Sequence, residues 1–241
     1  MVKLTIADGV GRVVLADVRS SNALGEDMVT ALEEAFAAIH RAADLRAVVL
    51  SGEGETFSCG APRELLLRLA AGEVSPTDIV LPRLLLDCAV PVVAAMAGHA
   101  TGGGFALGLA ADIVVIGEES RYGFTFMNLG FTPGMGATKL CEHVLSPAVA
   151  HELLYTGELR RGRRLAGSGV NYVVPREQVE AVALDVAARI AEKPRASIAA
   201  LKRTLSLPRR QAFEHSLTHE SFMHQLTFSA ASRRIENDYV E

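Results

Sequence analysis

The chain has 241 residues, of which 49% are hydrophobic and 22% are charged. This is the balance of a folded globular protein, and the length allows one domain with a substantial core and a buried pocket. A formal net charge of −4 provides no overall attraction to nucleic acid or to an anionic membrane surface, so we expect neither partner.

Cysteine usage and the first residues indicate a cytoplasmic protein. Cys59, Cys88 and Cys141 are odd in number and have no CxxC spacing, so we expect reduced thiols, with neither a disulfide framework nor a metal site. The N-terminus begins with a predicted strand rather than a leader sequence. The longest apolar stretch, residues 90–97, is far shorter than the ~20 residues that span a membrane.

Predicted strands and helices alternate in the first part of the chain. Residues 4–17 are expected to form a strand, a turn at Asp8 and Gly9, and a second strand. Residues 24–43 repeat apolar side chains at helical spacing and lead into a strand at 47–50. Helices at 62–71 and through residue 86 flank a loop that includes Pro76. Strands from 92 and at 113–116 flank a helix from about 103. This alternation predicts an α/β sheet with crossover helices.

The last third of the chain is predicted to be mostly helical. Helical spacing covers residues 139–145, 148–155, 177–192, 195–205 and 211–228. Pro175, Pro194 and Pro208 are expected at helix boundaries. We therefore expect a single domain over residues 1–241, with a core of about residues 1–190 and a helical C-terminal subregion of about residues 191–241.

Two glycine-containing turns follow predicted strands. Three glycines, Gly102, Gly103 and Gly104, separate a strand from a helix, where they let the backbone approach a ligand and aim free N–H groups at it. Tight helix–strand packing is the alternative explanation. The turn at Gly60 and Ala61 offers a second N–H, and two such donors are what an enolate oxyanion requires.

These segments resemble the crotonase (enoyl-CoA hydratase/isomerase) family over nearly the whole chain. The segments that resemble the family are FSCGA, GHATGGGFALGLAADIVV and YGFTFMNLGFTPGMGAT. The resemblance implies that the N–H groups of Ala61 and Gly103 hold the oxyanion, with Gly102 and Gly104 beside the substrate. It also implies a crotonase fold of repeated ββα turns with a helical C-terminal region that forms trimers or hexamers. No cofactor is implied beyond the substrate's thioester carrier.

Family hydratases use two glutamates that this chain lacks. Ala106 and Phe126 stand at those positions, and neither side chain can activate water or deliver a proton. Hydration is therefore disfavoured, as is an isomerase that uses the second glutamate alone. We expect Phe126 to line the substrate site instead.

Three segments are similar to a narrower branch, the decarboxylases of polyketide β-branching cassettes: DCAVPVVAAMAGHATGGG, FMNLGFTPGMGAT and HESFMHQLTF. These enzymes act on a glutaconyl group carried as a thioester on an acyl carrier protein. Loss of carbon dioxide leaves a dienolate, which two N–H donors stabilise without a glutamate. The resemblance implies that His224 donates the returning proton, and we expect His215 and His219 at the surface.

The branch also has a tyrosine and a lysine that meet the substrate carboxylate, and Leu65 and Leu69 stand at those positions. Two alternatives follow. Either desolvation of the substrate carboxylate assists decarboxylation, or the substrate carries no carboxylate at this place. Arg68 could supply the missing charge, and a solvated helix residue is the alternative interpretation.

The remaining candidates have weaker signals. His99 is expected to position a loop or line the pocket, and Asn128 to lie in a turn or in the pocket. Lys202 resembles the family's region near the phosphates of the thioester arm. The arginines form either a solvated face or a carrier contact: Arg160, Arg161, Arg163 and Arg164. Two other functions stay open, a hydratase/isomerase-like enzyme acting on a coenzyme A thioester and a catalytically silent thioester-binding scaffold.

Overall fold

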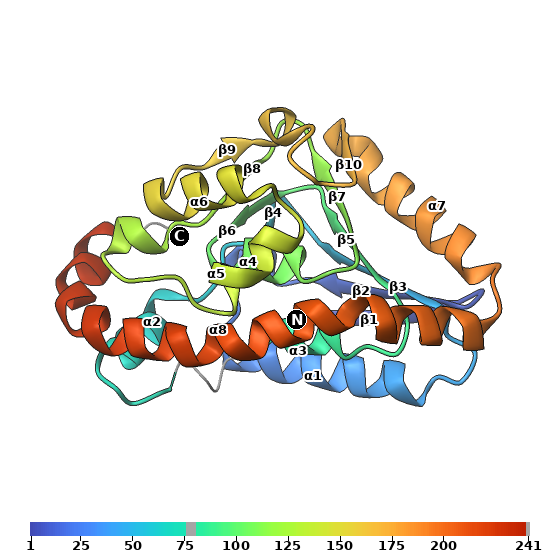
Figure 1. Cartoon of the computed structure of the whole chain (residues 1–241), viewed down its shortest axis with the longest axis horizontal. Coiled ribbons are helices and arrows are strands. Elements are labelled where there is room, and N and C mark those ends of the chain that lie inside the picture. The colour runs from blue at the N-terminus through green and yellow to red at the C-terminus, as the bar shows by residue number, and fades with distance from the viewer. Residues whose placement is uncertain (76–80, 240–241) are drawn as a thin grey trace.

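The computed structural model describes residues 1–75 and 81–239 and shows two sheets enclosed by helices (Figure 1). The larger sheet has the strand order β1-β2-β3-β5-β7-β10. Its strands are β1 Val2–Ala7, β2 Val10–Leu15, β3 Ala47–Gly52, β5 Val92–Met96, β7 Ile113–Gly117 and β10 Tyr172–Val174. β1 and β2 pair antiparallel around Asp8 and Gly9, as predicted, and the other pairs are parallel.

A smaller sheet has the order β4-β6-β8-β9 and was not predicted from the sequence. Its strands are β4 Thr56–Ser58, β6 His99–Thr101, β8 Arg121–Gly123 and β9 Arg160–Arg161. Strands of two or three residues are too short to show the alternation on which sequence prediction depends. β3, β5 and β7 of the larger sheet each continue into β4, β6 and β8. α2 (Arg63–Ala70) follows β4 and α4 (Gly103–Leu109) follows β6, so the chain makes repeated ββα turns.

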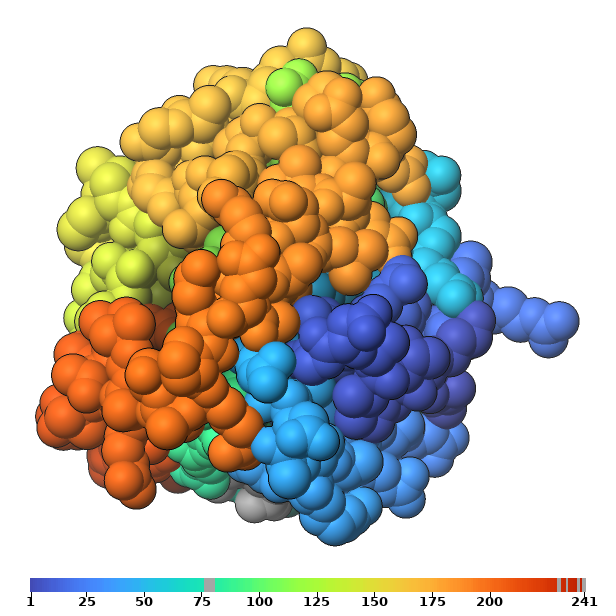
Figure 2. All heavy atoms as spheres, turned by 90° about the vertical axis from the view of Figure 1, so that its right-hand side faces the viewer, coloured from blue at the N-terminus to red at the C-terminus, as the bar shows by residue number. Residues whose placement is uncertain are grey.

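The larger sheet has an apolar core on each face. Val48 and Leu50 point into the main core, whereas the alternating Ala47 and Val49 pack against α7, Val179–Ala191. Figure 2 shows the side of the molecule where α7 lies in orange. The main core includes α1, Glu26–Arg41, and α3, Leu81–Leu86. The predicted loop at Pro76 falls outside the described residues.

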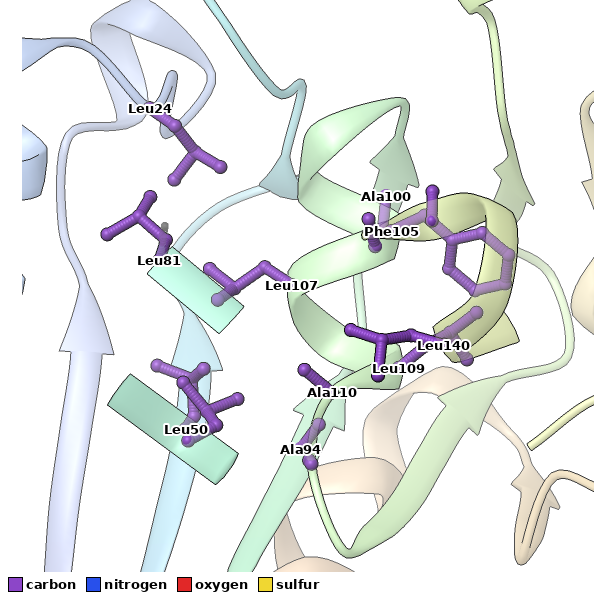
Figure 3. Packing of buried hydrophobic residues seen from close by; sticks show 14 of the residues in the cluster. Leu24, Leu50, Leu81, Ala94, Ala100, Phe105, Leu107, Leu109, Ala110 and Leu140 are labelled. Carbon is purple, nitrogen blue, oxygen red and sulfur yellow. The ribbon is translucent and has the colours of Figure 1, made fainter. Parts of the chain in front are cut away.

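α4 is buried along its whole length, so it is surrounded by core on every side. In Figure 3 its side chains point in different directions, Leu107 toward Leu81, and Phe105 and Leu109 toward Leu140. Leu140 ends α5, Ala137–Leu140, which continues as a 3₁₀ turn over Cys141–His143 where one longer helix was predicted. α6, Pro147–Thr156, follows.

The C-terminal helix α8 runs from Arg195 to Asp238 as one helix of 44 residues and crosses the width of the molecule (Figure 1). The prediction of two helices separated at Pro208 is therefore wrong. Lys202 and Arg209, on either side of Pro208, both bind the carboxylate of Asp112. These contacts hold the helix across the proline, which removes one backbone donor but does not force the helix to end. Within the described residues, no helix is both long enough and apolar enough to cross a bilayer.

Candidate active site

The first candidate donor lies where β4 turns into α2. The buried Ser58 hydroxyl donates to the Asn22 carbonyl (2.8 Å) and accepts the Gly60 N–H (3.2 Å). The Gly60 carbonyl accepts the Leu24 N–H at 2.7 Å. These bonds fix the turn before Ala61, whose own N–H has no acceptor among the described residues.

The second candidate donor lies where β6 turns into α4. Gly102 has a φ of +52°, which favours glycine, and its N–H donates to the Gly123 carbonyl at 2.9 Å. The Thr101 hydroxyl donates to the Cys59 carbonyl at 3.1 Å and so ties the two turns together. Within the described part of the chain, the N–H of Gly103 has no acceptor.

Gly60 allows the two N–H groups to converge. A Cβ on Gly60 would lie 2.9 Å from the Gly103 nitrogen, and one on Gly103 would lie 3.9 Å from the Ala61 nitrogen. A side chain at Gly60 would therefore obstruct the space between the donors. Two N–H groups without an acceptor among the described residues, held close together by separate turns, are the arrangement that an oxyanion hole requires.

Gly104 has a packing role rather than the substrate contact expected of it. A Cβ there would approach the Ser58 carbonyl to 2.2 Å, so only glycine lets α4 lie directly on β4. Gly104 does not line the cavity beside the donors, because its α-carbon faces the strand.

The two donors open into a cavity of about 70 Å³ with a mainly apolar wall. It is lined by Leu24, Cys59, Ala61, Leu66, Leu69, Gly102, Gly103, Thr125, Phe126, Leu129, Phe131, Gly134, Met135, His224, Phe228 and Tyr239. No Asp, Glu, Lys or Arg occurs among these described lining residues. In such an environment, hydrogen bonds to a developing oxyanion are stronger than in water.

Apolar groups occupy both positions where the family's hydratases carry glutamate. Ala106 is 1% exposed inside α4. Phe126 lines the cavity and packs against Phe124 and Phe131, with ring centroids 6.3 and 5.9 Å away. Neither position offers a group that could activate water.

His224 supplies an imidazole to the cavity wall from α8. Its Nε2 lies 2.9 Å from the Thr132 carbonyl, so Nε2 carries the hydrogen and Nδ1 is the acceptor. Nδ1 is buried and has no hydrogen-bond partner among the described residues. Burial lowers the pKa of His224, and the carbonyls of Thr132 and Pro133 oppose that shift. The ring packs edge-on against Phe228, with centroids 4.7 Å apart.

Helix α2 presents Leu66 and Leu69 to the cavity. These residues are three positions apart and therefore share a helix face. Leu65 is buried too, but it lines a separate groove on the other side of the helix. The apolar wall that was predicted from Leu65 and Leu69 is therefore formed by Leu66 and Leu69.

Arg68 points away from the cavity, which makes its predicted substrate contact wrong. Its guanidinium binds the Glu26 carboxylate, and its Nε lies 3.6 Å from Glu73. The hydrogen bond to Glu26 raises the pKa of Arg68. These two carboxylates hold the Arg68 guanidinium at the protein surface, away from the cavity, so Arg68 is a solvated helix residue.

His99 and Asn128 line a second groove of about 590 Å³ rather than the cavity itself. The cavity and the groove share Cys59, Thr125, Leu129 and Tyr239. His99 Nδ1 accepts the Arg121 N–H at 2.9 Å, and burial lowers the pKa of His99. Asn128 Nδ2 donates to the Gly157 carbonyl at 3.0 Å. Both side chains therefore hold neighbouring loops, which is one of the two roles expected for each, and neither lines the cavity beside the donors.

Lys202 is buried, and its predicted contact with carrier phosphates is therefore wrong. Its Nζ lies 2.6 Å from Asp112 and donates to the Leu85 carbonyl at 3.0 Å, with the side chain 2% exposed. Burial lowers the pKa of Lys202, and Asp112 opposes that shift. The Asp112 carboxylate balances the charge of the Lys202 ammonium inside the protein.

The predicted basic cluster is divided by the fold. Arg160 is buried between Glu152 and Glu158, at 2.7 and 2.9 Å. The other three members are exposed: Arg161, Arg163 and Arg164. The four arginines therefore do not form one solvated face, because Arg160 is paired inside the protein.

Two side chains beside the donors, Tyr239 and Met135, were not predicted from the sequence. The Tyr239 hydroxyl donates to the Ala61 carbonyl at 2.8 Å, a contact between residues 178 positions apart. Arg63 likewise donates to the Glu236 carbonyl at 2.9 Å, so the end of α8 is fastened to the first turn. Met135 has a φ of +60°, and its Sδ would lie 2.7 Å from a Cβ on Gly103. No local pattern identifies such long-range contacts.

The described residues contain no group of three or more His, Cys, Asp or Glu side chains able to hold a metal ion. Among the described residues, Cys59, Cys88 and Cys141 form no disulfide. Burial raises the pKa of Cys88, and it raises that of Cys141 to about 12. These two thiols therefore have little thiolate character.

The enoyl-CoA hydratase/isomerase family matches residues 5–241. The bacillaene synthase decarboxylase PksI of Bacillus subtilis (strain 168) is 39% identical over 226 residues, which cover 93% of this chain and 91% of PksI. A structure from a dehydratase/decarboxylase enzyme couple involved in polyketide beta-branching superposes with a TM-score of 0.95 at 39% identity, covering 99% of this chain and 96% of that one. The ECH2 decarboxylase domain of CurF from Lyngbya majuscula gives a TM-score of 0.92 at 37% identity, with 99% of each chain covered.

Proposed function

Because this chain belongs to the enoyl-CoA hydratase/isomerase (crotonase) family and has its α/β fold, we propose that it is a decarboxylase of polyketide β-branching. Its substrate is a 3-methylglutaconyl-type thioester on an acyl carrier protein. The observation that carries this proposal is the convergence of the Ala61 and Gly103 N–H groups on an apolar cavity lined by no carboxylate among the described residues. The similarity to PksI and to the CurF domain supports it.

In the proposed reaction, the thioester oxygen accepts hydrogen bonds from the Ala61 and Gly103 N–H groups. The bond between C4 of the glutaconyl group and its carboxylate carbon breaks, and carbon dioxide leaves. The bonding pair moves into a dienolate whose charge rests on the thioester oxygen. Losing one donor of an oxyanion hole typically costs about 2.7–4 kcal/mol of transition-state stabilisation. A proton then returns to C4 or to C2 and sets the position of the remaining double bond.

His224 delivers that proton from Nδ1. The hydrogen on Nε2 is held by the Thr132 carbonyl, so the ring must carry a second hydrogen on Nδ1 before it can donate. The negative charge of the bound substrate favours this imidazolium form and opposes the burial that lowers the pKa of His224. After the transfer, the ring is neutral and keeps its bond to Thr132.

The apolar wall at Leu66 and Leu69 assists by leaving the substrate carboxylate poorly solvated. That carboxylate is lost as neutral carbon dioxide while the charge moves to the thioester oxygen, which the two N–H donors bind. Among the described lining residues, His224 is the one side chain that can become a cation near the carboxylate. It therefore replaces the lysine that the chain lacks.

We also propose that the protein acts as a trimer or hexamer and takes its acyl group from the phosphopantetheine arm of the carrier, without a separate cofactor. Apolar side chains are strongly exposed on α8: Leu201, Leu205, Phe222 and Leu226. Each pair is spaced by four residues and so shares a helix face. Clustered exposed apolar side chains of this kind support a protein interface.

The test is incubation with 3-methylglutaconyl thioesters on acyl carrier protein and on coenzyme A, followed by mass spectrometry. We expect the carrier-bound substrate to lose the mass of carbon dioxide, and faster than the coenzyme A thioester. A crotonyl thioester on the same carrier is the control and should gain no water. Hydration without decarboxylation would indicate a hydratase, and no reaction with any substrate would indicate a silent thioester-binding protein.

A further inference from the structure

Glu220 is a buried carboxylate, 2% exposed, one turn before His224 on α8. It has no cationic partner among the described residues, and three neutral donors surround it. Its oxygens accept the Gly136 N–H (2.8 Å), the Thr138 N–H (3.0 Å) and the Thr138 hydroxyl (2.7 Å). Burial raises the pKa of Glu220, and these hydrogen bonds oppose that shift. Burying a carboxylate without an ion pair is costly, and it has no role in the reaction described above.

The loop that Glu220 holds has an unfavourable backbone. Met135 and Gly136 are consecutive residues with φ values of +60° and +75°. A residue other than glycine in this region costs about 1–3 kcal/mol and persists only when its surroundings impose it. The N–H groups of Gly136 and Thr138, two residues apart in this loop, both donate to the carboxylate of Glu220. Glu220 thereby holds the loop in this conformation.

The same loop forms part of the cavity wall. Gly134 and Met135 line the cavity, and Met135 Sδ packs against the donor residue Gly103. A Cβ on Gly134 would lie 3.0 Å from Cε1 of His224, so the ring lies directly against the loop. A shift of the loop would thus change both the oxyanion donor and the imidazole.

A row of side chains on α8 holds the loop at both ends. Glu220, His224 and Thr227 are spaced by four and three residues, so they share one helix face. The Nε2–H of His224 donates to the Thr132 carbonyl, and the hydroxyls of Thr227 and Thr132 lie 3.3 Å apart. Glu220 binds the far end of the loop at Gly136.

We propose that Glu220 is a positioning residue for the decarboxylation. Its carboxylate fixes residues 134–138, so that His224 keeps Nε2–H on Thr132 and leaves Nδ1, which has no partner among the described residues, as the nitrogen that exchanges a proton. The expected effect of Glu220 on kcat rests on the proposed function, whereas its expected effect on the His224 ring does not.

The first test is Glu220→Gln, which preserves size but replaces one acceptor oxygen with an NH₂ group that faces backbone donors. We expect kcat to fall by about tenfold with KM within about twofold, because substrate binding does not involve Glu220. The product should become a mixture of double-bond isomers. Glu214→Gln is the matched control, since Glu214 is on the same helix and makes an exposed pair with Arg83 at 2.8 Å. It should behave as wild type.

The second test needs no substrate. Nitrogen NMR of histidine-labelled protein reports which ring nitrogen of His224 carries hydrogen, with His224→Ala used to assign the signals. Wild type should show hydrogen fixed on Nε2, and Glu220→Gln should show a mixture of tautomers. If wild type fails to decarboxylate, the proposed function fails, and these spectra alone decide whether Glu220 positions the ring.

Thr138→Val keeps the proposal testable if Glu220→Gln does not fold. Thr138→Val removes one hydroxyl donor to Glu220 and keeps the backbone N–H, so it should cause a smaller change in the same direction. Wild-type kcat, product ratio and His224 spectra in whichever variant folds would overturn the proposal. Glu220 would then only stabilise the loop.

Discussion

The three consecutive glycines have different surroundings, although the sequence presents them as one run. Gly102 provides a φ of +52°, Gly104 lets α4 lie on β4, and Gly103 places its N–H beside Ala61. Gly103 is therefore the residue at which a side chain would interfere most directly with the substrate.

Gly103→Val should reduce kcat by about 10²–10³, because it displaces one oxyanion donor. Its Cβ would also lie 2.7 Å from Met135 Sδ, so the cavity wall must move. Gly25→Val is the control, since a Cβ there meets only ordinary contact with Pro62 at 3.4 Å. Circular dichroism and steady-state kinetics on both variants are the measurement. Wild-type turnover in Gly103→Val would remove this N–H from the mechanism.

His224→Ala should slow product formation or mix the double-bond isomers, while thioester binding stays nearly unchanged. The reason is that, in the proposed reaction, His224 returns the proton after carbon–carbon cleavage and does not hold the thioester oxygen. His219→Ala, an exposed histidine on the same helix, serves as the control. The same product at the same rate in His224→Ala would mean that water or another group supplies the proton.

The pH dependence of the rate should identify the imidazolium form. Burial lowers the pKa of His224 below its ordinary value of 6.5, and the proposed reaction uses the protonated ring. kcat/KM, which reports the free enzyme, should therefore fall as pH rises through a value below 6.5. kcat reports the substrate complex, where the substrate's charge raises the pKa, so its descending limb should lie at higher pH. A kcat/KM that is constant from pH ~5 to ~8 would contradict this assignment.

Among the elements, α8 connects the greatest number of separate parts of the site. Its first half is held by Asp112, which binds Lys202 and Arg209 on either side of Pro208. Its second half carries the His224 ring, and its end is fastened to Ala61 through Tyr239. The contact at Asp112 therefore affects the whole helix.

Asp112→Asn should destabilise the protein by about 3–5 kcal/mol, because the buried Lys202 and the partly buried Arg209 lose their counter-charge. Urea unfolding followed by circular dichroism gives the free energy of unfolding. Asp185→Asn removes an exposed pair with Arg189, at 3.2 Å on α7, and should cost only about 0.3–0.5 kcal/mol. Equal effects of the two substitutions would show that the Asp112 cluster contributes no more than a surface pair.

At the scale of the whole molecule, the chain brings together the ends of short strands from successive ββα turns. β4 and β6 are parallel neighbours, so the turns that follow them lie side by side. α8 then covers the site from a distant part of the sequence (Figure 1). In the proposed oligomer, the exposed apolar residues on α8 contact a second copy of the chain.

Introducing Phe222→Lys and Leu226→Lys together should convert the proposed trimer or hexamer to monomers, because two charges would be buried at the interface. Light scattering coupled to gel filtration measures the mass. Tyr155→Lys, at a side chain 79% exposed on α6, is the control and should leave the mass unchanged. An unchanged mass in the double variant would exclude this face of α8 as the interface.

The sequence by itself determined the α/β alternation, the family and the loss of the hydratase glutamates at Ala106 and Phe126. It also identified the two turns that carry Ala61 and Gly103. These conclusions depend on local spacing, on short motifs and on the chemistry of single side chains, all of which can be read without coordinates. The short strands of the smaller sheet and the continuity of α8 through Pro208 were not predicted from the sequence.

Only the tertiary structure decided which side chains share the cavity. It placed Leu66 there rather than Leu65, turned Arg68 outward to Glu26 and buried Lys202 against Asp112. It also brought Tyr239 to Ala61 and Glu220 to the loop behind His224. Each outcome depends on how a helix is rotated, or on which of several carboxylates or donors lies nearest after folding. Periodicity along the chain does not indicate which of these distant residues a side chain will contact, so the contacts are known only from the folded structure.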